Sequence, residues 1–180
     1  DPGVGSRVGL DGVSLAVAVG VELVELLFGL TLGIIAGFKG GRLDNLVMRA
    51  TDVMFAFPDI LLAILITGTL GKSLVNVFLA LALVGWPPMV RLVRSQVLSL
   101  RSREFVEAAR AMGASDGRIM VRHLLPNVLG PVVVAATVGM GAVILAESTL
   151  SFLGLGIQPP FPSWGSMIND YWRYRRSAPM

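Results

Sequence analysis

Two strongly apolar stretches of this 180-residue chain contain no charged residue and are long enough to cross a membrane. One covers positions 127–146, with 20 residues, and the other covers positions 73–90, with 18. A helix needs about 20 mostly apolar residues to span the hydrocarbon core of a bilayer. Only 15% of all residues are charged, whereas a typical soluble domain has about 25%. We therefore expect an all-α fold, a polytopic helical bundle in a membrane.

Four apolar segments are predicted to be membrane-spanning helices of a single transmembrane domain that covers residues 1–180. They lie at about 14–38, 52–70, 74–93 and 127–150. Pro58 falls inside the second segment. A proline is tolerated in a span when neighbouring helices or water satisfy the carbonyl groups that it leaves free. The bundle is expected to contain about four to five helices.

The basic residues predict the orientation of these spans. The link at 39–51 carries Lys39, Arg42 and Arg49, and the third link carries seven arginines, from Arg91 to Arg122. Positive charge close to the ends of spans marks the cytoplasmic side. The two links share a side in a serpentine chain, so 39–51 and 94–126 are predicted to be cytoplasmic.

The arginines near the C-terminus run against this orientation. Arg173, Arg175 and Arg176 follow the last span and would lie outside. The charge bias is strongest within about 15–20 residues of a span end, and these residues lie beyond that range. The predicted topology is therefore kept.

Catalytic and metal-binding motifs are missing from the sequence. There is no cysteine, and His123 is the one histidine, which makes a poor metal site without a cluster of thiols or carboxylates. Gly71-Lys72-Ser73 resembles the end of a phosphate-binding loop, but that loop needs glycine at the position of Ile66. We predict no catalytic residue, no metal and no cofactor, and we expect ATP hydrolysis in another subunit.

The third link carries the most informative pattern. Residues 101–112 read as a helix in which Glu107 can pair with Arg103 and Arg110, at spacings of four and three. Gly113 follows, and glycine is favoured just past a helix end because it enters the left-handed region easily. The pattern predicts a short helix and a tight turn.

A second short helix is predicted after this turn. Ser115 can cap it by accepting a hydrogen bond from a backbone N–H of its first turn. Pro126 is expected to end it, because proline cannot continue the hydrogen bonding of a helix interior.

These residues resemble a known loop. Glu107-Ala108-Ala109, then Gly113, then His123-Leu124-Leu125-Pro126 look like the EAA loop of binding-protein-dependent ABC importer permeases. The family has isoleucine where His123 stands. Further downstream, Leu150–Gly156, Gln158-Pro159-Pro160 and Ser163-Trp164-Gly165 are similar to the subfamily that serves dipeptide, oligopeptide and nickel importers.

In that family the loop forms a coupling helix that sits in a groove of the ATP-binding subunit. The resemblance implies that Glu107 supplies a charged contact to the ATPase, that Ala108 and Ala109 permit close approach, and that Gly113 forms the turn. Leu125 and Pro126 would complete the motif. The implied partners are ABC ATPase subunits, a second permease subunit, an extracytoplasmic solute-binding protein and membrane lipid.

The implied function is translocation of dipeptides or oligopeptides across the cytoplasmic membrane of a prokaryote by alternating access. Family members generally have six spans, so the chain is expected to be a fragment that lacks one span at each end. Nickel import is an alternative. A proton-coupled secondary transporter is a less favoured one, because it would not explain the EAA loop.

An arginine-rich helix–turn–helix is also compatible with DNA binding. The spans begin within a few residues on each side and leave little freedom to enter a groove, so no nucleic acid partner is expected.

Three carboxylates fall inside predicted spans, where ionisable groups usually face the bundle interior or a water-filled path. Glu147 either lines the entry for a peptide amine or a cation, or hydrogen-bonds to a neighbouring helix. Glu22 and Glu25 share a helical face and either line the pathway or face a partner subunit.

Overall fold

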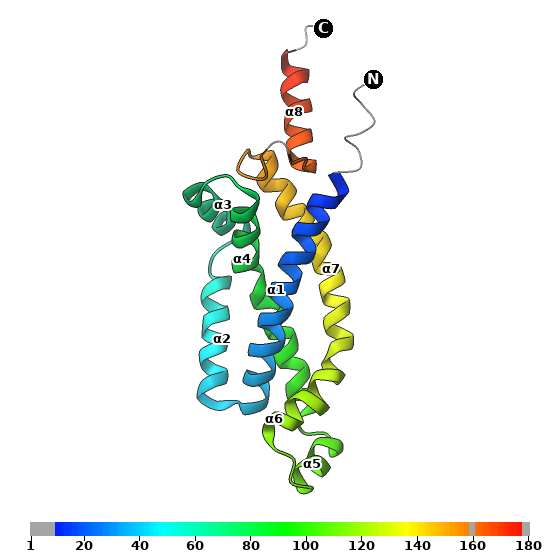
Figure 1. Ribbon diagram of the computed structural model, residues 1–180. Helices are drawn as coiled ribbons and strands as arrows, with labels where there is room; N and C mark the ends of the chain where they lie inside the picture. Colours follow the sequence, from blue (N-terminus) through cyan, green and yellow to red (C-terminus); the bar gives the residue numbers. More distant parts are fainter. Residues whose placement is uncertain (1–9, 159–160, 178–180) are drawn as a thin grey trace. The chain divides into compact units, whose positions relative to one another are not determined.

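The computed structural model describes residues 10–158 and 161–177, and most of them are helical (Figure 1). Within these ranges no residue belongs to a strand. The predicted all-α class is confirmed.

Three helices in the described ranges are long and apolar enough to cross a membrane: α1 (Leu10–Lys39), α4 (Leu74–Leu100) and α7 (Leu125–Phe152). At about 1.5 Å per residue, even α4 exceeds the hydrocarbon thickness of about 30 Å. Pro87 and Pro88 lie inside α4, and Pro131 lies inside α7. Both helices continue through their prolines.

The second predicted span, at about 52–70, is divided between two helices. α2 (Gly41–Phe55) and α3 (Asp59–Leu70) meet at an angle of 79°. Pro58 stands at the N-cap of α3 in an extended conformation, with ψ 125°, and a proline disfavours helical geometry in the residue before it. The two helices together make either one broken span or a re-entrant loop.

The contacts of the chain divide it into two compact units. Unit 1 comprises the described parts of residues 1–22, 58–84 and 139–180, and unit 2 comprises residues 23–57 and 85–138. That residues 1–180 form a single domain stays a prediction.

In unit 2, three glycines of α1 allow α4 to approach closely. They are spaced by four residues and face side chains with the same spacing on α4: Gly29 faces Met89, Gly33 faces Val93 and Gly37 faces Val97. A Cβ atom on Gly33 would lie 2.7 Å from Cβ of Val93. The constant offset along both helices means that they pack in parallel, and small residues at such spacing are typical of close helix pairs in membranes.

Charged pairs join α2 to α4 within unit 2. Arg94 donates two hydrogen bonds to the carboxylate of Asp44, one of them from Nη2 to Oδ2 at 2.6 Å. Arg91 pairs with Asp52, and its guanidinium carbon lies 4.4 Å from the centre of the Phe55 ring. A bidentate arginine–carboxylate pair is strong and directional, so the Arg94–Asp44 pair fixes α2 against the C-terminal half of α4.

In unit 1, α7 ends in a glycine turn. Gly154 has φ 75°, its N–H donates to the Ser151 carbonyl, and the N–H of Leu155 donates to the Leu150 carbonyl at 3.0 Å. The next helix, α8 (Trp164–Ser177), begins ten residues later. The described residues between α7 and α8 are not helical. Pro159 and Pro160 lie outside the described residues.

Candidate functional site

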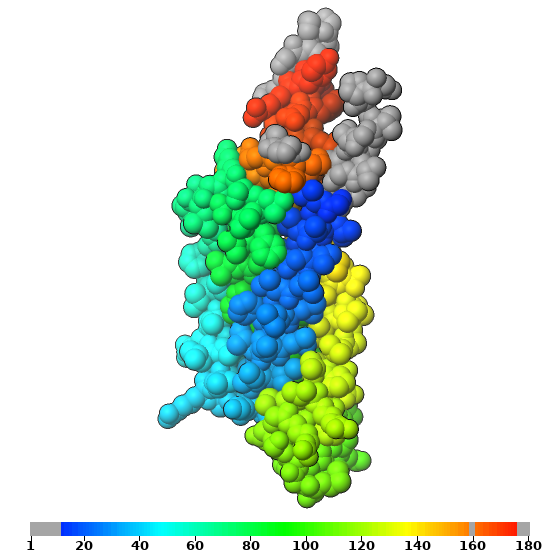
Figure 2. Space-filling view, viewed as in Figure 1, coloured from blue at the N-terminus to red at the C-terminus, as the bar shows by residue number. Residues whose placement is uncertain are grey.

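The segment between α4 and α7 contains three short elements: α5 (Glu104–Ala111), α6 (Asp116–Ile119) and a π-helix, η1 (Met120–Leu124). We call residues 104–124 the α5–η1 segment. It belongs to unit 2, and Figure 2 shows its yellow-green surface exposed. The two predicted short helices and the turn between them are therefore present.

The turn after α5 depends on Gly113, which has φ 81°. Its N–H donates to the Arg110 carbonyl, and the N–H of Ala114 donates to the Ala109 carbonyl, both at 3.0 Å. This pair of hydrogen bonds is the Schellman motif, which satisfies the free carbonyl groups at a helix end. The predicted role of Gly113 in the turn is confirmed by its geometry.

Ser115 begins the second helix as predicted. Its Oγ accepts a hydrogen bond from the N–H of Arg118 at 3.4 Å. The predicted helix end at Pro126 is wrong, because the helix continues from Asp116 to Phe152. The N–H of Leu125 donates to the Met120 carbonyl, five residues back, and a proline in the next position needs no donor in the first turn of α7.

One side of the α5–η1 segment is buried in the core of unit 2. The core side chains that it contributes are Val106, Ala109, Ile119 and Leu124, none more than 2% exposed. They belong to the same apolar cluster as Phe38 of α1 and Val97 of α4. Protein interiors are close-packed, so the segment is held firmly to the long helices.

The other side of α5 is open. Glu107 and Ala108 are exposed, whereas Ala109 is 2% exposed and faces the core. The predicted pairs of Glu107 with Arg103 and Arg110 do not form among the described residues. Arg103 is the N-cap of α5, and the guanidinium of Arg110 lies 5.8 Å from the centre of the Phe38 ring. Glu107 is thus left without an ion-pair partner within the described part of the chain.

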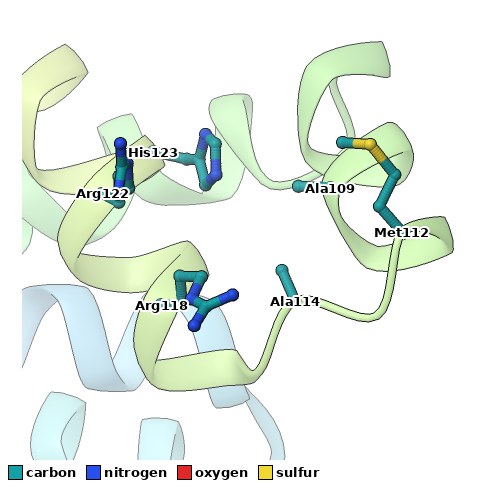
Figure 3. Close-up of a pocket in the computed structure, with 6 residues that line it drawn as sticks. All are labelled: Ala109, Met112, Ala114, Arg118, Arg122 and His123. Carbon is teal, nitrogen blue, oxygen red and sulfur yellow. The ribbon is translucent and has the colours of Figure 1, made fainter.

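A cavity of about 280 Å³ opens beside α5 (Figure 3). Its lining residues are Ala109, Met112, Ala114, Arg118, Arg122 and His123. The sequence predicts these arginines only as positive charge on the cytoplasmic side. Their convergence depends on the glycine turn, which folds α5 back beside η1.

At the other end of α7, in unit 1, Glu147 is completely buried. Its carboxylate accepts hydrogen bonds from Oγ of Ser151 at 2.7 Å and from Oγ of Ser14 on α1 at 3.4 Å. This matches the second of the two predicted alternatives, a carboxylate bound to a neighbouring helix. A role of Glu147 in the pathway stays a prediction.

The two carboxylates of α1 pack against glycines of different helices. Glu22 is 1% exposed and lies against Gly139 of α7 within unit 1, and Glu25 is 8% exposed and lies against Gly85 of α4 within unit 2. Neither carboxylate oxygen of Glu22 has a hydrogen-bond partner among the described residues. A residue larger than glycine at 85 or 139 would occupy the space of these carboxylates.

The sequence of the chain matches a family along most of its length. Residues 29–179 match the family described as "Binding-protein-dependent transport system inner membrane component". The chain belongs to this family. The resemblance to importer permeases and the predicted place in the inner membrane are confirmed, because the family description and the apolar helices agree.

Relatives of this transport family with known names include three permease proteins. A dipeptide transport system permease protein of Alkalihalophilus pseudofirmus is 50% identical over 93% of this chain and 56% of its own length. A glutathione transport system permease protein of Pectobacterium atrosepticum is 44% identical, and an oligopeptide transport system permease protein of Bacillus subtilis is 39% identical, each over 88% of this chain and 52% of its own length. The chain spans about half the length of these relatives.

Membership of a family of transport components agrees with the prediction that the chain is not an enzyme. The family also supports a binding-protein-dependent system as the setting of this chain.

The left-handed conformation of Gly113 predicts that a larger residue at this position destabilises the turn. Gly113→Val should destabilise the turn by about 1–2 kcal/mol, because a side chain with a branched Cβ is strained in the left-handed region. A loss of this size should speed hydrogen exchange of the Ala114 amide about tenfold. The measurement is amide exchange by mass spectrometry on the full-length protein.

Gly117→Val is the matched control for this change. Gly117 lies in the same segment, and a Cβ atom added there would meet nothing within 4 Å, as at Gly113, but the φ of Gly117 is not positive. If the Ala114 amide exchanges equally fast in the two variants, strain at the positive φ of position 113 is not the cause of the effect, and the prediction is wrong.

Proposed function

We propose that this chain is the membrane-spanning part of a permease subunit that moves peptides across the cytoplasmic membrane in an ATP-driven importer. The α5–η1 segment transmits motion from a separate ATPase subunit to the long helices. The main support for this proposal is that α5 has one solvent-exposed face and one face buried in the core of unit 2. Glu107 is exposed and without an ion-pair partner in the described residues, whereas Val106 and Ala109 are buried in the core.

A rigid connection is needed for such transmission. The buried side of α5 packs into a cluster that also contains Phe38 of α1 and Val97 of α4. Arg101 adds a hydrogen bond from Nη1 to the Gly37 carbonyl at 3.1 Å. Because the cluster is close-packed, a displacement of α5 moves the ends of α1 and α4 rather than compressing the space between them.

The exposed side of α5 suits insertion into a groove of a partner. Ala108 is small and exposed beside the fixed charge of Glu107, which fits the mode in which a helix binds in a groove. Ala109 was expected to permit close approach of the ATPase, but it is buried and packs α5 against the core of unit 2. Leu125 is half-buried against the core and Pro126 is exposed, so they position the start of α7.

Peptides are the proposed substrate class. The named relatives include permeases of dipeptide, glutathione and oligopeptide systems, and all three solutes are peptides. A second permease subunit, two ATPases and an extracytoplasmic binding protein would complete the importer. Residues 39–51 and 94–126 would face the cytoplasm, where they meet the ATPase. Nickel remains an alternative cargo.

A proton-coupled transporter is the second candidate function. The observation that favours it is Glu22, a buried carboxylate without a hydrogen-bond partner among the described residues, since such groups in membranes mark ion or proton paths. It leaves the exposed face of α5 without a role. The two candidates differ in their source of energy.

The test is transport by the full-length permease, reconstituted in vesicles with its partner permease, ATPases and binding protein. We expect uptake of a labelled dipeptide that requires ATP and stops when the ATPases are omitted. Uptake driven by a proton gradient without ATPases would contradict the proposal. ATP-dependent uptake of nickel but not of dipeptide would keep the coupling role and reject the peptide substrate.

A further inference from the structure

The cavity beside α5 contains basic side chains and no acidic ones. Arg118 and His123 form one wall, with Arg122 next to them on η1, and Ala109, Met112 and Ala114 form the facing wall (Figure 3). Arg118 and Arg122 are exposed, and neither forms an ion pair among the described residues. Such a cavity favours an anionic group. The guanidinium groups suit phosphate, to which arginine can donate two parallel hydrogen bonds.

The position of the cavity along the chain points to a membrane surface. Arg122 and His123 directly precede residues 124–146, which contain no charged side chain and continue without interruption into α7. In a spanning helix this boundary lies at the level of the lipid headgroups. Basic side chains at that level attract anionic phospholipids, and basic pockets at the ends of spans bind their headgroups.

Exposed apolar side chains follow the cavity residues along the chain, on α7. Leu129 and Val133 follow Arg122 after seven and eleven residues, which places them near the same face of the helix. Leu129 is 40% exposed and Val133 is 58% exposed. A basic cavity that leads into an exposed apolar face matches the two parts of a phospholipid, the headgroup and the acyl chains.

We propose that the cavity lined by Arg118, Arg122 and His123 binds the phosphate headgroup of an anionic phospholipid, whose acyl chains lie along Leu129 and Val133. The arginines supply charge, and the ring N–H of His123 can donate a hydrogen bond to phosphate oxygen whether or not the histidine is charged. Ala109 and Met112 of α5 line the same cavity, so bound lipid also braces the α5–η1 segment. The proposal requires this segment to lie at a membrane surface, but it does not depend on peptide transport.

The test measures lipid retained by the full-length permease in a neutral detergent, by native mass spectrometry. The protein is titrated with dioleoyl phosphatidylglycerol, with dioleoyl phosphatidylcholine, and with inorganic phosphate as a competitor. We expect preferential retention of phosphatidylglycerol. Each basic side chain near an anionic surface contributes about a fivefold factor, so Arg118→Gln with Arg122→Gln should weaken binding about 25-fold.

A matched pair of arginines controls for general attraction to basic surface. Arg42 and Arg49 on α2 are exposed and form no ion pair among the described residues, and Arg42→Gln with Arg49→Gln should leave retention unchanged. Arg118→Lys with Arg122→Lys preserves the charge and should keep most of the binding. This variant guards against a result that only reflects misfolding.

Four results would overturn the proposal. Equal retention of the two lipids by the unchanged protein would show that the cavity does not bind the anionic headgroup. The same conclusion would follow if the Arg118→Gln, Arg122→Gln variant retained as much phosphatidylglycerol as the unchanged protein. Displacement of the lipid by inorganic phosphate would assign the cavity to a soluble anion. Loss of the retained lipid when the ATPase subunit binds would show that the cavity instead receives an acidic side chain of that subunit.

Discussion

Replacing Glu107 by lysine should abolish ATP-driven uptake while the permease still inserts and folds. Glu107 is exposed on α5 and takes no part in the core, so the change removes no packing. Under the proposed function its carboxylate is buried against the ATPase. Loss of one partner of a buried charged contact costs about 2–5 kcal/mol, and reversal of the charge adds repulsion. Uptake into vesicles should fall more than about 25-fold, since each 1.4 kcal/mol is a factor of ten.

Glu104→Lys is the matched control. Glu104 is exposed in the first turn of the same helix, and the substitution changes the charge by the same amount. Its main expected effect is the loss of a favourable interaction with the helix dipole, about 0.3–1 kcal/mol. If both variants lose uptake equally, the net charge of α5 matters rather than Glu107. Normal uptake by Glu107→Lys with the ATPase bound would reject the coupling role of this residue.

The local part of the α5–η1 segment could be predicted from the sequence. Gly113 and Ser115 act within four or five residues of their own position, through the Schellman hydrogen bonds and the N-cap. Such interactions depend on residue type and spacing alone. The geometry of the turn was therefore predictable without knowledge of the rest of the fold.

The side chains around Glu107 could not be predicted in the same way. The spacing of Arg110 suggested an ion pair along the helix, but its guanidinium lies over Phe38, a residue 72 positions earlier in the chain. An exposed ion pair within a helix contributes only about 0.3–0.5 kcal/mol, so a tertiary contact easily replaces it. The cavity between α5 and η1 also depends on tertiary folding.

The sequence indicates the position of the break between α2 and α3 but not the angle between the two helices. Pro58 marked the position, but the size of the bend depends on what holds α2. Asp44 and Asp52 bind Arg94 and Arg91, about 40 to 50 residues away. A single sequence gives no sign of which charges pair over such a distance. It predicted a span at 52–70 because hydropathy continues across the proline.

The glycines of α1 carry a sequence signal for helix packing that hydropathy alone does not show. Gly29, Gly33 and Gly37 recur every four residues, and this spacing alone predicts a close helix–helix contact in a membrane. The sequence could have indicated the contact face of α1. It could not have identified α4 as the partner, because Val93 and its neighbours resemble any apolar helix surface.

Gly33→Leu should separate α1 from α4 and destabilise the permease by about 3 kcal/mol, at the upper end for overpacked cores. A Cβ at position 33 would lie 2.7 Å from Cβ of Val93 and 2.9 Å from the Val90 carbonyl oxygen. The second of these atoms belongs to the backbone, so no side-chain rotation relieves the overlap and the helices must move apart. The separation would also weaken the neighbouring contacts of Gly29 and Gly37.

Thermal unfolding of the purified full-length permease, followed by loss of the monodisperse fraction, measures this effect. Gly130→Leu on α7 is the matched control, because a Cβ there meets nothing within 4 Å, and leucine favours a helix more than glycine by about 0.8–1 kcal/mol. The control should be as stable as the unchanged protein or more stable. If Gly33→Leu unfolds at the same temperature as Gly130→Leu, α1 and α4 do not pack through their glycine face, and the core that connects the α5–η1 segment to these helices would have to be arranged differently.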